Sequence, residues 1–187
     1  MSRIRRFGVT LALLSGLTVV STAPAFATST VVTAVVNAGT LTLVAPATAA
    51  TTPITLNGLD QTSPYSMALN ANDNTGSGAG WNLTITSTIF TSGAPVHTLS
   101  AAASSLTGVT AVCSGPGACT NPTNGIGYPV AVPAGAGPPA AVKFFNAAVN
   151  TGMGNFTVTP TIVVSFPAST FAGTYTSTVT LASVSGP

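Results

Sequence analysis

Along much of this chain every second residue is apolar, and the residues between are threonine, serine or asparagine. Between positions 156 and 166 the residues of even number are Phe156, Val158, Pro160, Ile162, Val164 and Phe166. Because successive side chains of a strand point to opposite faces, this period of two favours β-strands with one buried face over helices. Pro160 has no backbone N–H, so it predicts an edge position or a β-bulge within its strand.

The same alternation predicts further half-buried strands, one that begins at Trp81 and one from Tyr175 to Leu181. Shorter candidates lie at residues 30–36, 40–44, 54–56, 66–69, 96–99, 109–113, 128–132 and 142–147, and residues 101–105 are a candidate helical turn. Clusters of Gly, Pro and Asn separate the strands, as in domains built from antiparallel sheets. We therefore predict an all-β fold, an antiparallel Ig-like β-sandwich of about ten short strands.

The first 27 residues have the pattern of a secretory signal peptide. Three arginines lie within the first six residues, an apolar run follows at 9–20, and Ala25-Phe26-Ala27 supplies a small-residue cleavage site. The adjacent Arg5 and Arg6 are also compatible with a twin-arginine export signal, but we favour an ordinary Sec signal. We expect cleavage after Ala27 and a single exported domain at residues 28–187.

Charged residues are scarce, with Lys+Arg 4 and Asp+Glu 2 in the whole chain. Beyond the predicted signal peptide they are Lys143, Asp60 and Asp73, a net charge of −1. Nucleic-acid binding is excluded, because it needs clustered Lys and Arg. We also expect no membrane contact after signal cleavage, because no later apolar stretch reaches the roughly 18 residues of a span. The 45% of hydrophobic residues argues against intrinsic disorder.

The titratable side chains do not form a recognisable catalytic or metal-binding pattern. Asp60 and Asp73 stand in turn-like contexts, where Asp usually caps its own backbone. His97 has no nucleophile motif or metal-spaced partner. The oxygen-bearing side chains at 70–76 include one carboxylate and no closing Glu, which is a poor calcium loop. We therefore predict no enzyme, no cofactor and no metal.

Two cysteines, Cys113 and Cys119, enclose the loop Ser-Gly-Pro-Gly-Ala. In an exported chain, such a pair predicts a small-loop disulfide. Its closed loop is short, so we expect it to fix a turn more than to hold the fold together.

A glycine-spaced turn runs into a strand that opens with the chain's single tryptophan, Trp81. The turn begins at Asp73 and has glycines at Gly76, Gly78 and Gly80. Glycine permits a positive φ or a close approach of two backbone segments. The turn therefore predicts an anchor between a loop and a strand, with Trp81 as the first buried residue.

These residues resemble the WxL domain, a family of secreted, wall-associated proteins of Gram-positive bacteria. The family's Trp-x-Leu motif is matched by Trp81-Asn82-Leu83, and its lead-in D-x-x-G-x-G-x-G-W by residues 73–81. A second family motif, Y-x-x-x-L-x-W-x-L-x-x-x-P, corresponds to residues 175–187. There Tyr175 matches, whereas Leu181 stands at the family's Trp position. The chain thus resembles a divergent member with a degraded distal motif.

The resemblance implies a non-catalytic cell-surface protein bound non-covalently to peptidoglycan or another cell-wall glycan, with Trp81, Leu83, Tyr175 and Leu181 as binding residues. The residues themselves favour these four as core positions of two strands that pair or pack, and the two interpretations are compatible. An alternative function is a self-assembling or partner-binding subunit of pilin or coat type. This alternative rests on the scarcity of charge, because Lys143 is the only lysine or arginine left that could protect the sheet edges. Unprotected edges can associate with other surface proteins or with another copy of the chain.

Overall fold

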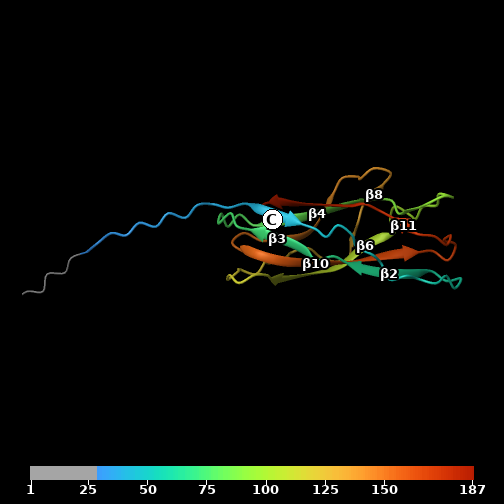
Figure 1. The fold of residues 1–187 in the computed structure, drawn as a ribbon, viewed down its shortest axis with the longest axis horizontal. Coiled ribbons are helices and arrows are strands. Elements are labelled where there is room, and N and C mark those ends of the chain that lie inside the picture. The colour runs from blue at the N-terminus through green and yellow to red at the C-terminus, as the bar shows by residue number, and fades with distance from the viewer. Residues whose placement is uncertain (1–28) are drawn as a thin grey trace, which may run out of the picture. The chain divides into compact units, whose positions relative to one another are not determined.

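The structure is a computed structural model that describes residues 29–187 (Figure 1). The predicted signal peptide lies outside the described residues. Contacts divide the chain into two compact units, Met1–Val35 and Val36–Pro187. Residues 29–35, the described part of the first unit, have no regular secondary structure and are exposed. The strands described below belong to the second unit.

No helix occurs within residues 29–187, which confirms the all-β prediction. The strands are β1 (Leu41–Val44), β2 (Gln61–Ser66), β3 (Leu69–Asp73), β4 (Trp81–Thr88), β5 (Thr91–Ser92), β6 (Ser104–Cys113), β7 (Val130–Ala131), β8 (Ala134–Gly135), β9 (Val142–Ala147), β10 (Gly154–Phe166), β11 (Tyr175–Thr176) and β12 (Val179–Ser185). Accordingly, no helix in the described part of the chain is long and apolar enough to cross a membrane.

The largest sheet has the strand order β1-β3-β10-β6-β7, and β2 also pairs with β10. Its pairs are antiparallel. The even-numbered residues of β10 are buried from Phe156 to Val164, as the alternation predicts. Apolar residues on this face form one half of a sandwich core.

Pro160 lies in the middle of a central strand, so the prediction of an edge position is wrong. On one side of β10 the pairing with β3 ends at Val158 and the pairing with β2 begins at Thr161, and Pro160 stands in the gap between them. A central strand can accept a proline there, because neither β3 nor β2 pairs with it on that side; on the other side it pairs with Val109 of β6. The alternative, a bulge, is close to what occurs: the register with β6 shifts between Thr161 and Ile162.

The second sheet has the order β12-β4-β8, with β9 also paired to β4. The pairs of β4 with β12 and β9 are antiparallel, and the short pair with β8 is parallel. Figure 1 shows the layer of β4 and β8 lying over the layer of β3, β10 and β2. Trp81 and Phe156, one from each sheet, have ring centroids 6.4 Å apart, so the two sheets share one core. This is the predicted sandwich.

Several strand predictions are wrong. Residues 30–36 and 54–56 form no strand, residues 96–99 form only an isolated bridge at Thr98, and residues 67–68 separate β2 from β3. The run from Tyr175 to Leu181 divides into β11 and β12. Of the expected helical turn, residues 101–102 form a turn closed by a hydrogen bond from the Ala103 N–H to the Ser100 carbonyl, and β6 begins at Ser104. Alternating apolar and polar residues indicate that a segment tends to be extended, but the segment becomes a strand only where another strand is placed to pair with it.

The prediction that β4 is half-buried is also wrong, because its polar face is covered too. Asn82 and Thr86 are buried. Asn82 Nδ2 donates to the Gly186 carbonyl over 2.7 Å, and Thr86 Oγ1 donates to the Pro139 carbonyl over 2.9 Å. The strand is therefore central within its sheet and covered on both faces.

Cys113 and Cys119 form a disulfide, with their Cα atoms 6.1 Å apart, as predicted. The bond joins the end of β6 to a loop six residues further along the chain. Closing so short a loop lowers the conformational entropy of the unfolded chain, and this stabilises the folded protein by about 2 kcal/mol.

Replacing both Cys113 and Cys119 with serine is accordingly expected to lower the free energy of unfolding by about 2 kcal/mol and to leave the domain folded. Urea denaturation of the two proteins measures the difference. Titration of free thiols in the denatured, unreduced parent protein checks the bond itself. One thiol or more per chain would contradict the bond, and an unfolded double variant would show that the loop holds the fold together.

Candidate functional site

The glycine-spaced turn before β4 is built around a buried carboxylate. Asp73 is 4% exposed, and its Oδ1 accepts hydrogen bonds from the backbone N–H of Thr75 over 3.1 Å and from Thr75 Oγ1 over 2.7 Å. Gly76, Gly78 and Gly80 have φ values of 65°, 66° and 74°. Each glycine thus adopts a left-handed conformation that other residues rarely accept.

Trp81 is fully buried at the centre of the sandwich. Its Nε1 donates to the Gly152 carbonyl over 2.8 Å, and its ring centroid lies 5.6 Å from that of Phe145. Leu83 is equally inaccessible to solvent. A side chain with no exposed surface cannot stack on a sugar, so in this structure Trp81 and Leu83 are core residues.

The two motif strands are neighbours in one sheet. In the antiparallel pairing of β4 with β12, Leu181 lies opposite Ile85 and Ser183 lies opposite Leu83. Leu181 is half-buried and packs against the edge of the core. Tyr175 is not part of this group, because β11 pairs with β5 and not with β4. The structure therefore places Trp81, Leu83 and Leu181 on two paired strands, with Ser185 and not Leu181 opposite Trp81, and places Tyr175 in a different sheet.

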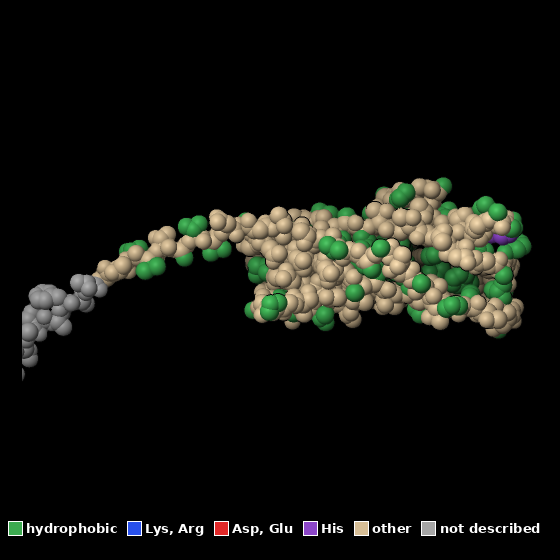
Figure 2. All heavy atoms as spheres, in the orientation of Figure 1, with side chains coloured by type: hydrophobic (Ala, Val, Ile, Leu, Met, Phe, Trp, Pro, Cys, Tyr) green, Lys and Arg blue, Asp and Glu red, His purple; other side chains and the backbone are tan. Residues whose placement is uncertain are grey.

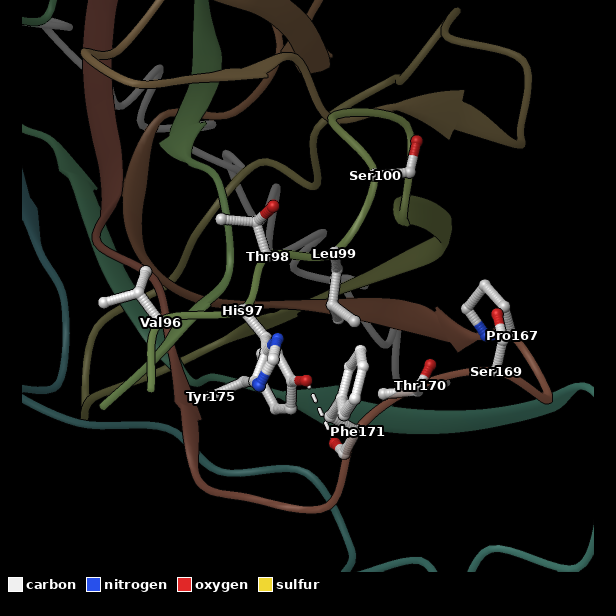
Figure 3. A pocket seen from close by; sticks show the side chains of 10 residues that line it. All are labelled: Val96, His97, Thr98, Leu99, Ser100, Pro167, Ser169, Thr170, Phe171 and Tyr175. Carbon is white, nitrogen blue, oxygen red and sulfur yellow. Dashed lines mark hydrogen bonds between the residues drawn. The ribbon is translucent and has the colours of Figure 1, made fainter. Parts of the chain in front are cut away.

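Tyr175 lines a cleft of about 370 Å³ beside the small β5–β11 sheet. Figure 3 shows His97, Phe171 and Tyr175 grouped at one side of it. The His97 and Phe171 rings stack with centroids 3.9 Å apart and an angle of 9° between their planes. The Tyr175 hydroxyl donates to the Phe171 carbonyl over 3.0 Å. The remaining lining residues are Val96, Thr98, Leu99, Ser100, Pro167, Ser169 and Thr170.

A second cleft, of about 430 Å³, adjoins the first at Thr98. It is rich in hydroxyl side chains; its lining consists of Thr88, Ile89, Thr91, Thr98, Gly135, Ala136, Thr176, Ser177 and Thr178. Tyr175 lines one cleft and Thr176 lines the other, as expected for successive residues of a strand. The two clefts therefore share the β5–β11 sheet.

Neither cleft is lined by a Lys, Arg, Asp or Glu side chain. Asp60 contacts the loop beside the first cleft, because its Oδ1 accepts a hydrogen bond from the Ala168 N–H over 2.7 Å. This bond holds the loop that carries Phe171. Phe171 is 61% exposed. The face in Figure 2 likewise shows no Lys, Arg, Asp or Glu side chain, and hydrophobic side chains are scattered over it. The clefts thus offer aromatic rings and hydroxyl groups, without a Lys, Arg, Asp or Glu side chain.

Sequence reasoning missed this site apart from Tyr175. It interpreted His97 as a lone histidine and gave Phe171 no role. The lining residues of the first cleft come from two segments, 96–100 and 167–175, which are far apart in the sequence. No spacing rule connects such segments, so only the fold reveals them.

Two tyrosines have shifted pKa values, and neither lies in a cleft. Burial raises the pKa of Tyr65 to about 12. Burial also raises the pKa of Tyr128, partly offset by the hydrogen bond from Asn124. Both are thus held in the neutral form. Within residues 29–187, no three His, Cys, Asp or Glu side chains are grouped so that they could hold a metal ion.

Comparison with protein families, with curated proteins and with solved structures finds no match to this chain. The resemblance to the WxL domain stays a prediction carried by residues 73–83 and 175–187.

Proposed function

We propose that this protein is a non-catalytic, exported surface protein of a Gram-positive cell that associates non-covalently with peptidoglycan or another cell-wall glycan. The observation that carries the proposal is the uncharged cleft with the stacked pair His97 and Phe171 and with Tyr175 beside them. A sugar ring presents C–H groups on its faces and hydroxyl groups at its rim. Aromatic side chains with a few hydroxyl groups complement both, as in other concave ligand sites.

The family motifs then act through folding. Trp81 and Leu83 are buried, so their part in wall binding is to hold the sandwich that carries the cleft. Tyr175 has both roles, because it begins the second motif and lines the cleft. A leucine at position 181 is compatible with this division, since that side chain packs at the edge of the core and not in the cleft.

Replacing Phe171 with alanine is expected to weaken binding to purified peptidoglycan about tenfold, because one exposed ring of the stacked pair is lost. Co-sedimentation of the exported chain measures the affinity. Val112→Ala, at an exposed residue of β6 outside both clefts, is the matched control and should bind as the parent does. Binding should also survive high salt, because salt screens charges and the clefts carry none.

Two results would reject parts of this proposal. A folded parent protein that fails to sediment with peptidoglycan or other wall glycans would reject wall association. A Phe171→Ala variant that binds as tightly as the parent would keep wall association and reject the cleft as its site.

A second function, a self-assembling surface subunit, is favoured by the edge strand β12 of the second sheet. Within the described residues β12 is hydrogen-bonded to β4 alone, so its other edge has no hydrogen-bonded strand, although β1 lies close to β12. Its sequence from Val179 to Ser185 holds no charged residue and no proline. Natural sheets usually protect such edges with charges, prolines or bulges, and β12 shows none of these.

A further inference from the structure

Four valines stand exposed in the segment of residues 30–36. Val31, Val32, Val35 and Val36 are between 81% and 94% exposed, the highest exposures among the large hydrophobic side chains of the described residues. Isolated apolar residues on a surface are ordinary, but four in seven consecutive positions are not. Such a cluster of exposed valines is typical of a surface that associates with another one.

The same segment has the composition of a strand. It reads Thr-Val-Val-Thr-Ala-Val-Val, with six β-branched residues and no charge, glycine or proline. When it is extended, Val31 and Val35 lie on one face and Val32 and Val36 on the other. A strand that is apolar on both faces is typical of one that is covered on both.

The free edge of β12 presents unpaired backbone groups. At the two ends of this strand, the Thr88 N–H bonds to the Thr178 carbonyl and the Gly186 N–H bonds to the Gly80 carbonyl, each over 2.9 Å. Hydrogen-bonding groups of a strand alternate in direction, so the even-numbered residues of β12 face β4. The odd-numbered residues, Val179, Leu181, Ser183 and Ser185, thus direct their N–H and C=O groups away from the sheet.

The side chains along this edge are also incompletely covered. Val179 and Leu181 are half-buried against the core, and Val184 on the outer face is 47% exposed. A further strand beside β12 would cover more of each. The segment at 30–36 and the strand β12 have the same length of seven residues, and neither carries a charge that would oppose their pairing.

We propose that residues 30–36 of one copy pair with β12 of a second copy as an added strand. The pairing satisfies the outward N–H and C=O groups of β12 and covers the valines in one step. It joins two different surfaces of the chain, head to tail, so repeated pairing gives a ring or a filament. This inference rests on the assembly function proposed above and is independent of wall binding.

Two variants of the exported chain remove one partner each. Val32→Asp with Val35→Asp disables the added strand, because these residues lie on opposite faces and one aspartate must point toward the core of the acceptor. Ser183→Pro disables the acceptor, because it removes an N–H that points away from β4 and leaves the β4 pairing in place. Circular dichroism confirms that each variant keeps the β-fold.

The parent protein is expected to show a mass that rises with concentration in sedimentation velocity. Each variant alone should stay a monomer. An equimolar mixture should form dimers and nothing larger, because only one productive pairing remains, between the intact segment of Ser183→Pro and the intact β12 of the double aspartate variant. Leu59→Asp with Val149→Asp, which adds the same charge at two exposed residues elsewhere, is the control and should assemble as the parent does.

The proposal is overturned by a parent protein that is monomeric at every concentration, by a double aspartate variant that assembles as the parent does, or by a mixture that stays monomeric. If Ser183→Pro fails to fold, a synthetic peptide of residues 29–37 replaces it and must bind the double aspartate variant and shorten the parent assemblies. Co-sedimentation of that monomeric variant with peptidoglycan tests wall binding separately, so the failure of either function is visible without the other.

Discussion

Replacing Trp81 with alanine is expected to lower the free energy of unfolding by about 3 to 5 kcal/mol. The indole is fully buried, lies between Phe145 and Phe156, and joins the two sheets of the sandwich. Truncation leaves a cavity and also removes the partner of the Gly152 carbonyl. Domains are usually stable by only about 5 to 15 kcal/mol, so the loss takes a large part of the total. Urea denaturation measures it.

Two companion variants separate the contributions. Trp81→Phe keeps a ring in the core and loses the Nε1 donor, so it should cost less than alanine does. Val149→Ala, at an exposed position, should change stability by less than about 0.5 kcal/mol. A Trp81→Ala protein that is as stable as the parent but no longer binds the wall would contradict the structure and make Trp81 a contact residue.

The sequence correctly predicted those strands in which apolar and polar residues alternate and which also pair with a neighbouring strand. Residues 142–147 form β9 at the expected bounds, and β10 buries the expected face. The failures share a cause: residues 30–36 and 96–99 have strand-like composition, but only Thr98 of the second segment pairs with another residue. Extended structure depends on a neighbour, and the neighbour is chosen by the fold as a whole.

The candidate site was less predictable than the fold. The turn at Asp73 and the burial of Trp81 follow from local spacing, because glycine and tryptophan constrain their surroundings. The pairing of His97 with Phe171 depends on two segments that meet only in the folded chain. Similarly, the covered polar face of β4 depends on the carbonyls of Pro133 and Pro139, which lie in a distant loop.

Replacing Gly80 with alanine is expected to cost about 2 to 5 kcal/mol, the second largest effect that we predict for a single residue. Gly80 has a φ of 74°, and a methyl group there would meet the carbonyl oxygen of Ala147 and lie 3.0 Å from the carbonyl carbon and oxygen of Ala148. The left-handed conformation costs about 1 to 2 kcal/mol for an L-residue, and overpacking against a backbone adds about 1 to 3 kcal/mol. Thermal and urea unfolding measure the sum.

Gly76→Ala is the matched control, because it separates the conformational cost from the packing cost. Gly76 has a φ of 65°, close to that of Gly80, but a methyl group there would meet nothing within 4 Å. It should therefore cost only the conformational part, about 1 to 2 kcal/mol. If both variants lose the same stability, the approach of Ala147 and Ala148 to Gly80 is not a packing constraint. If Gly80→Ala loses more, the last glycine is required because it lets the strand with Trp81 lie directly against its neighbour.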